Sequence, residues 1–256
     1  MGDAPTGPPE LPPSGPEPDG GERVRVLSYN LRSLRDDRAA LARVVRACDP
    51  DLLCLQESPR FWRPAQQAAR LAHSTGTVVL SGGRSASGPL LLGKVRTAVL
   101  RTGDLLLPRT PGLHQRGFAT AVVRIGRAAP FSVTSCHLSL DPAERRQQAS
   151  LLLDHLAGQG VPYGVVGGDF NEHPDGPAWR LLAERLRDGY AVAPWGGEMT
   201  SVPDHPYQRI DAVFATPGLE VLACGVPDRL PGVDPADLRA ATDHLPVLAV
   251  LRVPAG

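Results

Sequence analysis

Several short apolar segments of this chain end in a carboxylate, an amide or an imidazole, and this recurrence constrains the fold more than any other feature. In the stretch GVVGGDFN, residues 164–171, an apolar run reaches two glycines and is followed by Asp169 and Asn171. Side chains alternate along a strand, so Asp169 and Asn171 would point to the same side. The other such residues at the ends of apolar runs are Asn30, Glu57, His137, Asp211 and the pair Asp243-His244. In an α/β sheet these ends gather along one edge, where ligands bind.

Strand-like and helix-like segments alternate along the chain, which predicts an α/β protein. Asp141, Pro142 and Glu144 fit the first positions of a helix as N-cap, N1 and N3. Helices are expected at 37–48, 61–72, 142–156 and 177–187. Strands are expected at 24–29, 52–55, 77–80, 90–92, 95–100, 118–125, 131–136, 164–168, 210–215, 219–226 and 247–253.

Residues 23–256 are expected to form one domain, preceded by a disordered tail at 1–22. The tail is rich in Pro, Gly and Glu, and it lacks the apolar segment of a signal peptide. No stretch approaches the length of a membrane span. The four cysteines are scattered without a CxxC pair, so neither a zinc site nor a disulfide framework is expected. We therefore expect a cytoplasmic protein, and a monomer.

The charge balance argues against a chain whose overall field attracts nucleic acid. Lys plus Arg and Asp plus Glu both number 27, so the formal net charge is zero, and aromatic residues make up only 5% of the chain. Asparagine is rare: Asn30 and Asn171 are the only two, and both lie at the ends of predicted strands. This scarcity makes their placement informative.

The polar residues at the strand ends form a coherent chemical set. Carboxylate and amide oxygens of Glu57, Asp243 and Asn30 suit Mg²⁺ or Mn²⁺. Histidines such as His244 donate to a phosphate oxygen or move a proton near neutral pH. Asp211 is a candidate to orient His244, because we expect their two strands to be neighbours in one sheet. No Ser or Cys nucleophile signature is present, so direct attack by water is the natural mechanism.

Six short motifs, in this order, resemble the endonuclease/exonuclease/phosphatase superfamily. They are SYN (28–30), LQE (55–57), CHL (136–138), GGDFN (167–171), RID (209–211) and TDHLPV (242–247). Each motif alone is weak, but GDFN with an upstream QE and a terminal DH in this order is specific. The resemblance spans about 23–253 and implies a four-layer α/β sandwich. In this fold two packed, mixed but mostly antiparallel β-sheets are flanked by helices.

The resemblance also implies a role for each site residue. Glu57 matches the main Mg²⁺ ligand, and Asn30 and Asp243 would complete or support the metal site. His244 matches a histidine that pairs with a carboxylate, here Asp211. Asp169 and Asn171 match residues that position the attacking water and the phosphate. His137 and Arg116 match residues that contact the substrate phosphate. Many members carry an amide or carboxylate before the strand that reads GPLLLGKV (88–95), where this chain has Pro89. His137 would then lack its usual orienting partner.

The function implied is a Mg²⁺-dependent phosphoester hydrolase of the phosphodiesterase or nuclease type. A phosphomonoesterase or a lipid-headgroup phosphodiesterase of the same fold is the alternative. For a lipid substrate we would expect an apolar hairpin, and Phe61-Trp62 is too isolated in the sequence to count as one. A non-catalytic binding module is not favoured, because every main ligand position is filled. A metal-binding regulatory domain would use His173, Asp175, Asp204 and His205.

Overall fold

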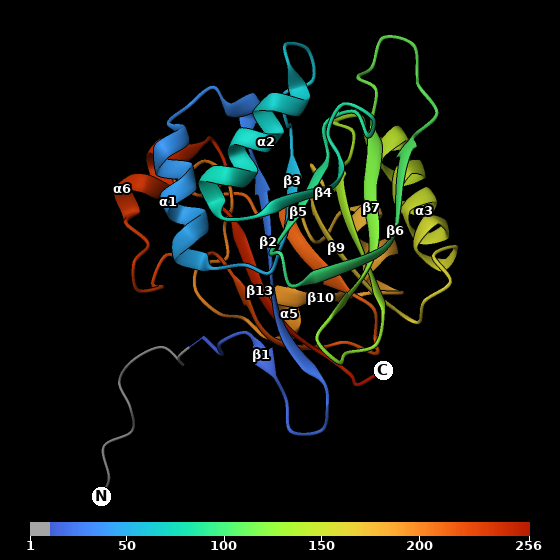
Figure 1. The fold of residues 1–256 in the computed structure, drawn as a ribbon. Helices are drawn as coiled ribbons and strands as arrows, with labels where there is room; N and C mark the ends of the chain where they lie inside the picture. Colours follow the sequence, from blue (N-terminus) through green and yellow to red (C-terminus); the bar gives the residue numbers. More distant parts are fainter. Residues whose placement is uncertain (1–10) are drawn as a thin grey trace, which may run out of the picture.

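The computed structural model describes residues 11–256, which form two β-sheets packed face to face between layers of helices (Figure 1). The first sheet has the strand order β12-β13-β2-β3-β5-β4, with β1 paired to β2. Its strands are β1 (Gly15–Pro16), β2 (Glu22–Asn30), β3 (Leu52–Gln56), β4 (Val78–Gly82), β5 (Leu90–Gly93), β12 (Glu220–Gly225) and β13 (Val247–Val253). Only β2 and β3 run parallel; the other pairs are antiparallel.

The second sheet has the order β10-β11-β9-β8-β7-β6, and again one pair, β8 with β9, is parallel. Its strands are β6 (Thr97–Leu106), β7 (Gly117–Ile125), β8 (Phe131–His137), β9 (Tyr163–Asp169), β10 (Arg187–Asp188) and β11 (Asp211–Ala215). The helices are α1 (Arg38–Cys48), α2 (Pro64–Thr75), α3 (Pro142–Ala157), α4 (Pro177–Ala183), α5 (Gly189–Val192) and α6 (Pro235–Ala241), with a 3-10 helix at Arg32–Leu34.

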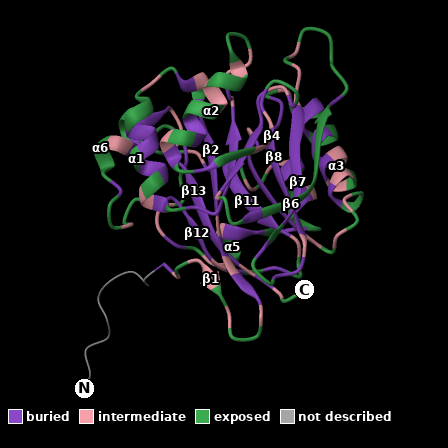
Figure 2. Cartoon of the chain, in the orientation of Figure 1, coloured by how far each residue is buried: buried purple, intermediate pink, exposed green. Residues whose placement is uncertain are grey.

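Strand alternation builds three separate cores, so the predicted four-layer sandwich is confirmed. On β2, Leu27 and Tyr29 face α1, α2 and α6, whereas Val24 and Val26 face the second sheet. On the other face of the second sheet, Phe214 of β11 packs in a core to which α3 and α4 also contribute. Figure 2 shows the strands largely buried and the outer surfaces of the helices exposed. The four cysteines are buried and free, as the sequence predicts.

The predicted boundary between tail and domain needs correction. Within the predicted tail, Leu11 is buried, and β1 pairs with β2 through Gly15 and Arg23. The guanidinium of Arg25 donates to the backbone carbonyls of Leu11 and Pro12. These contacts bury an apolar side chain and satisfy backbone acceptors, so residues 11–22 belong to the folded domain. The rest of the predicted tail, residues 1–10, lies outside the described residues.

One helix begins later than its apolar pattern predicts, and this matters for the site. The expected helix at 61–72 is α2, which spans Pro64–Thr75. Pro64 occupies the first turn, where a proline costs no hydrogen bond, and Arg63 before it has a left-handed φ of 45°. Phe61 and Trp62 therefore lie in the loop that joins β3 to α2.

Candidate active site

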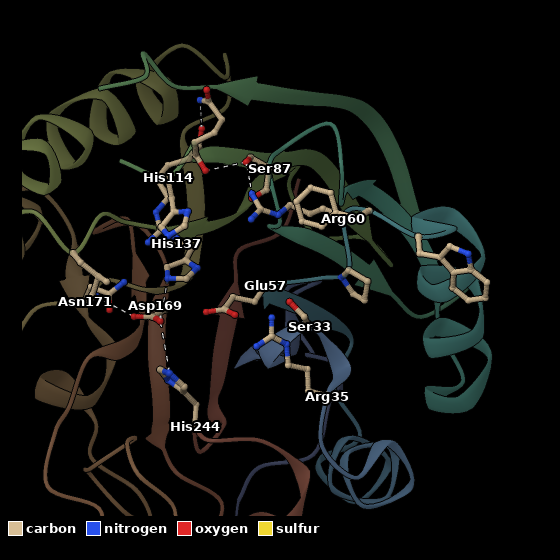
Figure 3. Close-up of a pocket in the computed structure, with 16 residues that line it drawn as sticks. Ser33, Arg35, Glu57, Arg60, Ser87, His114, His137, Asp169, Asn171 and His244 are labelled. Atoms are coloured by element: carbon tan, nitrogen blue, oxygen red, sulfur yellow. Dashed lines mark hydrogen bonds and ion pairs between the residues drawn. The ribbon is translucent and has the colours of Figure 1, made fainter. Parts of the chain in front are cut away.

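The parallel strand pairs bring the predicted polar residues to one end of the sandwich. In the first sheet β2 ends at Asn30 and β3 is followed by Glu57. In the second sheet β8 ends at His137 and β9 at Asp169. Between them lies a cavity of about 540 Å³ that is lined by Glu57, His137, Asp169, Asn171, Arg116 and His244, among others (Figure 3). The sheet edge expected from the sequence is thus an edge shared by two sheets.

The glycines before Asp169 allow the two sheets to approach each other closely beneath this cavity. A Cβ on Gly167 would lie 2.6 Å from the Cβ of Cys54 and 3.1 Å from that of Ser28, which both belong to the facing sheet. Any side chain at position 167 would therefore push the sheets apart. The glycine keeps Asp169 of one sheet within reach of Asn30 of the other.

Asn30 links the carboxylates of the two sheets. Its Nδ2 donates to Asp169 Oδ2 at 3.0 Å and lies 3.3 Å from Glu57 Oε1, while its Oδ1 accepts from the backbone N–H of Arg32 at 3.0 Å. Asn30 is almost fully buried. With both ends of its amide used, Asn30 orients Glu57 and Asp169.

Asp211 and His244 are in direct contact, with Asp211 Oδ2 2.8 Å from Nδ1 of the imidazole. The predicted reason for this contact is wrong, because β11 and β13 belong to different sheets and the pair meets between the two layers. The other ring nitrogen, Nε2, lies 3.9 Å from Asp169 Oδ2. Burial disfavours the charged imidazole, but the Asp211 carboxylate outweighs burial and raises the pKa of His244 to about 10.

Asp169 lies at the centre of the site, with His137 and His244 on either side of it (Figure 3). Burial and then the nearby Asp211 charge raise the pKa of Asp169 to about 7. His137 Nε2 lies 3.4 Å from Asp169 Oδ2, so His137 has a carboxylate beside it, whereas the resemblance implied that it would lack an orienting partner. Burial, and next the positive charge of Arg116, hold the pKa of His137 well below its usual value.

Asn171 and Arg116 reach the same cavity from two loops. Asn171 has a left-handed φ of 50°; its Nδ2 donates to the carbonyl of Leu138 at 2.9 Å, and its backbone N–H donates to Asp169 at 3.0 Å. The Arg116 guanidinium is largely buried, which lowers its pKa, and its Nε has no hydrogen-bond partner among the described residues. A partly buried cation without a carboxylate partner is suited to receive an anionic group.

The structure places Asp243, a predicted metal ligand, apart from the others. Its carboxylate is partly exposed, lies 3.1 Å from Arg32 Nε and is absent from the cavity lining. Thr242, the residue before it, is fully extended, with φ of −170° and ψ of 174°. The chain therefore presents His244 toward Asp211 and Asp169, while the preceding side chain pairs with Arg32.

Several lining residues were missed in the sequence. Arg35, Arg60, His114 and Leu140 border the cavity, together with Phe61 and Trp62. Arginine clusters at 32–38 and 60–63 are visible in the sequence, but their usual meaning is a solvated helix surface. The one usable signal is Pro64, whose preference for the first turn of a helix leaves residues 61–63 in a loop.

The chemistry of these side chains fits a divalent cation. Asp169, Asp211 and His244 form the one group of three or more His, Cys, Asp or Glu side chains among residues 11–256 whose ligand atoms all lie within 4.8 Å. Across the same residues, no Arg or Lys forms an ion pair with Glu57, Asp169 or Asp211, and the buried Asp211 Oδ1 has no hydrogen-bond partner. Oxygen-rich sets with surplus negative charge are typical of Mg²⁺ or Mn²⁺ sites. His173, Asp175, Asp204 and His205 do not join any such group in this part of the chain.

Comparison with known proteins agrees with this geometry. Residues 27–244 match the sequence profile of the Endonuclease/Exonuclease/phosphatase family. No curated protein sequence matches the chain significantly. The chain belongs to the Endonuclease/Exonuclease/phosphatase family and is a hydrolase acting on phosphoric ester bonds. The family is metal-dependent.

Solved structures share the fold at low sequence identity. An endonuclease/exonuclease/phosphatase from Bacteroides vulgatus superposes with a TM-score of 0.75 at 20% identity, covering 90% of this chain and 99% of that one. A mannosyl-6-phosphatase from Bacteroides thetaiotaomicron gives 0.74 at 21% identity, covering 89% and 99%. Truncated TDP2 of Caenorhabditis elegans gives 0.67 at 16% identity, covering 90% and 97%. Within residues 11–256, no helix has the length and apolar character needed to cross a membrane.

Proposed function

We propose that this protein is a Mg²⁺- or Mn²⁺-dependent phosphoesterase in which water attacks the phosphorus directly, in line with the leaving group. The observation that carries this proposal is that Glu57 and Asp169 share the Asn30 amide next to Asp211, and that no Arg or Lys among residues 11–256 is ion-paired to any of these three carboxylates. Asp211 is balanced by the His244 imidazole, but Glu57 and Asp169 have no Arg or Lys partner in this part of the chain, and a bound divalent ion would offset the cost of holding these two carboxylates together.

Glu57 would hold the ion, with its carboxylate oriented by Asn30. The bound ion would supply Lewis-acid stabilisation of the charge that develops on the phosphate oxygens. Because Asp243 pairs with Arg32, we give it no direct place among the ligands.

The remaining residues divide the work of phosphate binding and proton transfer. The Asp211 carboxylate fixes the His244 ring and keeps it protonated, so Nε2–H is available to donate to a phosphate oxygen. Asp169, oriented by Asn30 and by the backbone of Asn171, would accept the proton of the attacking water. The neutral His137 and the Arg116 guanidinium would contact the remaining phosphate oxygens.

Both phosphodiesters and phosphomonoesters fit this arrangement. A diester, as in nucleases, was the first expectation from the sequence. The structural neighbour named mannosyl-6-phosphatase, which aligns over 89% of this chain, favours including monoesters of sugars as the second candidate. The cytoplasmic location and the monomeric state stay predictions.

The test is a substrate panel with Mg²⁺, Mn²⁺ and EDTA. It includes bis-p-nitrophenyl phosphate, plasmid DNA, an abasic-site duplex, sphingomyelin, inositol phosphates and sugar phosphates. We expect hydrolysis of at least one phosphoester class that EDTA abolishes and Mg²⁺ or Mn²⁺ restores. Activity that survives EDTA, or no hydrolysis of any phosphoester with either ion, would contradict the proposal.

A further inference from the structure

Two adjacent aromatic side chains are largely exposed to solvent at the rim of the active-site cavity. Phe61 is 88% exposed and Trp62 is 68% exposed. Both line the same cavity as Asp169 and His244, and so does Leu140, which is 71% exposed. Exposing large aromatic surface to water is unfavourable, and here the exposed groups are concentrated at the entrance to a catalytic site.

The rim is held in place by hydrogen bonds. Arg60 Nη1 donates to the Oγ of Ser87 at 2.9 Å and to its carbonyl at 3.2 Å, and Ser87 Oγ donates to the carbonyl of Gln115 at 2.9 Å. This chain of bonds joins the loop that carries Phe61 to the loop that carries His114 and Arg116. On the other side, Pro64 fixes the start of α2 directly after the aromatic pair.

Each aromatic ring is paired with a guanidinium group. The Arg60 guanidinium carbon lies 5.5 Å from the centroid of the Phe61 ring, and that of Arg63 lies 5.1 Å from the Trp62 ring. The face of an aromatic ring attracts a guanidinium group, so each ring has a cation beside it at the rim. Planar cations interleaved with aromatic rings are typical of sites that stack another planar ring beside a phosphate.

Resting on the proposed function, we infer that Phe61 and Trp62 form a subsite for a planar ring carried by the substrate, so that the substrate class is a phosphoester of a nucleoside. The scissile phosphate lies among Glu57, Asp169 and His244, and the ring attached through the sugar stacks at the rim. A cavity of about 540 Å³ lies within the usual range for small-molecule sites.

A lipid surface is the competing occupant of an exposed Phe-Trp pair. The two rings border a concave cavity and have guanidinium groups beside them, whereas a loop that inserts into a bilayer presents apolar groups outward. These observations favour the binding of one substrate ring in the cavity over insertion into a lipid bilayer.

The experiment compares substrates that share the leaving oxygen and differ only in the ring. The monoester pair is a nucleoside 5′-monophosphate and ribose 5-phosphate; the diester pair is a thymidine oligonucleotide and the same oligomer with abasic residues. For at least one pair, we expect the wild-type kcat/KM to be higher with the ring by roughly 5- to 150-fold, the range for one stacked base. Trp62→Ala should remove most of this preference through KM with little change in kcat, because stacking is equal in the ground and transition states.

Tyr207→Ala is the matched control, since Tyr207 is 66% exposed and does not line the cavity; it should keep the preference. Hydrolysis of bis-p-nitrophenyl phosphate without any preference for the ring overturns the subsite and leaves the proposed function standing. No hydrolysis of any of these phosphoesters contradicts the proposed function, and the subsite falls with it. Binding of the wild type to phosphatidylserine vesicles that Trp62→Ala abolishes, without a ring preference, would assign the rim to lipid instead.

Discussion

One carboxylate residue lies just before strand β3 and another just after it, and the two have different partners. Asp51, at the start, is fully buried, and both of its oxygens have partners. Its Oδ1 lies 3.0 Å from Arg96 Nε and 2.9 Å from Nη2, and its Oδ2 accepts from the backbone N–H of Arg25 at 2.9 Å. Glu57, about 20 Å away at 3.3 Å per residue, contacts Asn30 and lines the same cavity as the Asp169 carboxylate.

The comparison distinguishes Asp51, whose charge stabilises the fold, from the carboxylates at the Glu57 end, which are available to a ligand. At the Asp51 end the cation is built into the chain, as Arg96. At the Glu57 end, Asp211 is balanced by the His244 imidazole, but no Arg or Lys in residues 11–256 forms an ion pair with Glu57 or Asp169, and burial raises the pKa of Asp169 to about 7. A structural site satisfies its own charges, whereas a catalytic site leaves some of them for the metal and the substrate.

The largest effect is expected from breaking the Asp211–His244 pair. Asp211→Asn removes the charge that raises the pKa of His244, so this pKa should fall, and NMR titration of the imidazole should show it. Asp211→Asn and His244→Ala should each lower kcat by about 10²- to 10⁴-fold, the range for losing acid–base assistance.

A double-mutant cycle on kcat/KM shows whether the two residues act as one unit. The double variant should be barely worse than the worse single variant, because coupled catalytic residues are not additive. Fully additive losses would mean that the 2.8 Å contact has no catalytic consequence.

The opposite end of β3 should respond in stability and not in activity. Asp51→Ala should lower the free energy of unfolding by about 3 kcal/mol, the lower end for breaking a buried pair, because Arg96 stays partly hydrated. Below its melting temperature the variant should keep its kcat within about twofold. Denaturant unfolding and steady-state kinetics on the same preparation measure both quantities.

Asp49→Asn provides the control for this substitution. Asp49 is an exposed carboxylate 2.7 Å from Lys94 Nζ, and Asn tolerates the left-handed conformation found at this position. Exposed pairs contribute little, so the loss should stay below about 1 kcal/mol. A kcat that falls with Asp51→Ala as far as with Asp211→Asn would erase the distinction between the two ends.

Local patterns predicted the α/β class and the polar residues at the strand ends, whereas the four layers were implied by the resemblance to the family. Alternation along β2 separates Val26 from Leu27, and the glycines before Asp169 indicate a close approach, which the structure places at Gly167 against the facing sheet. The pattern does not say which sheet a strand joins. For that reason the contact of Asp211 with His244 was expected within one sheet and occurs between two.

The rest of the site depends on side-chain directions and on long-range contacts that no local pattern encodes. Asp243 lies near the end of a strand like the other candidates, but the chain turns its carboxylate to Arg32. Phe61 and Trp62 resemble the start of an amphipathic helix until Pro64 is taken as its first turn. The contacts of Leu11 with Arg25 join segments whose composition gives no reason for them to meet.

The smallest expected effect is the one that locates the metal. Glu57→Gln keeps the shape of the side chain and its contact with Asn30 but removes one negative charge from the ligand set. Affinity for Mn²⁺, measured by titration calorimetry without substrate, should fall by at least about tenfold, which corresponds to about 1.4 kcal/mol. Asp243→Asn is the matched comparison, because it removes one negative charge from a carboxylate that is paired with Arg32. The Mn²⁺ affinity of this variant should fall by less than about threefold. Equal losses of Mn²⁺ affinity in the two variants would return Asp243 to the ligand set predicted from the sequence. An unchanged Mn²⁺ affinity in Glu57→Gln would instead place the ion among Asp169, Asp211 and His244.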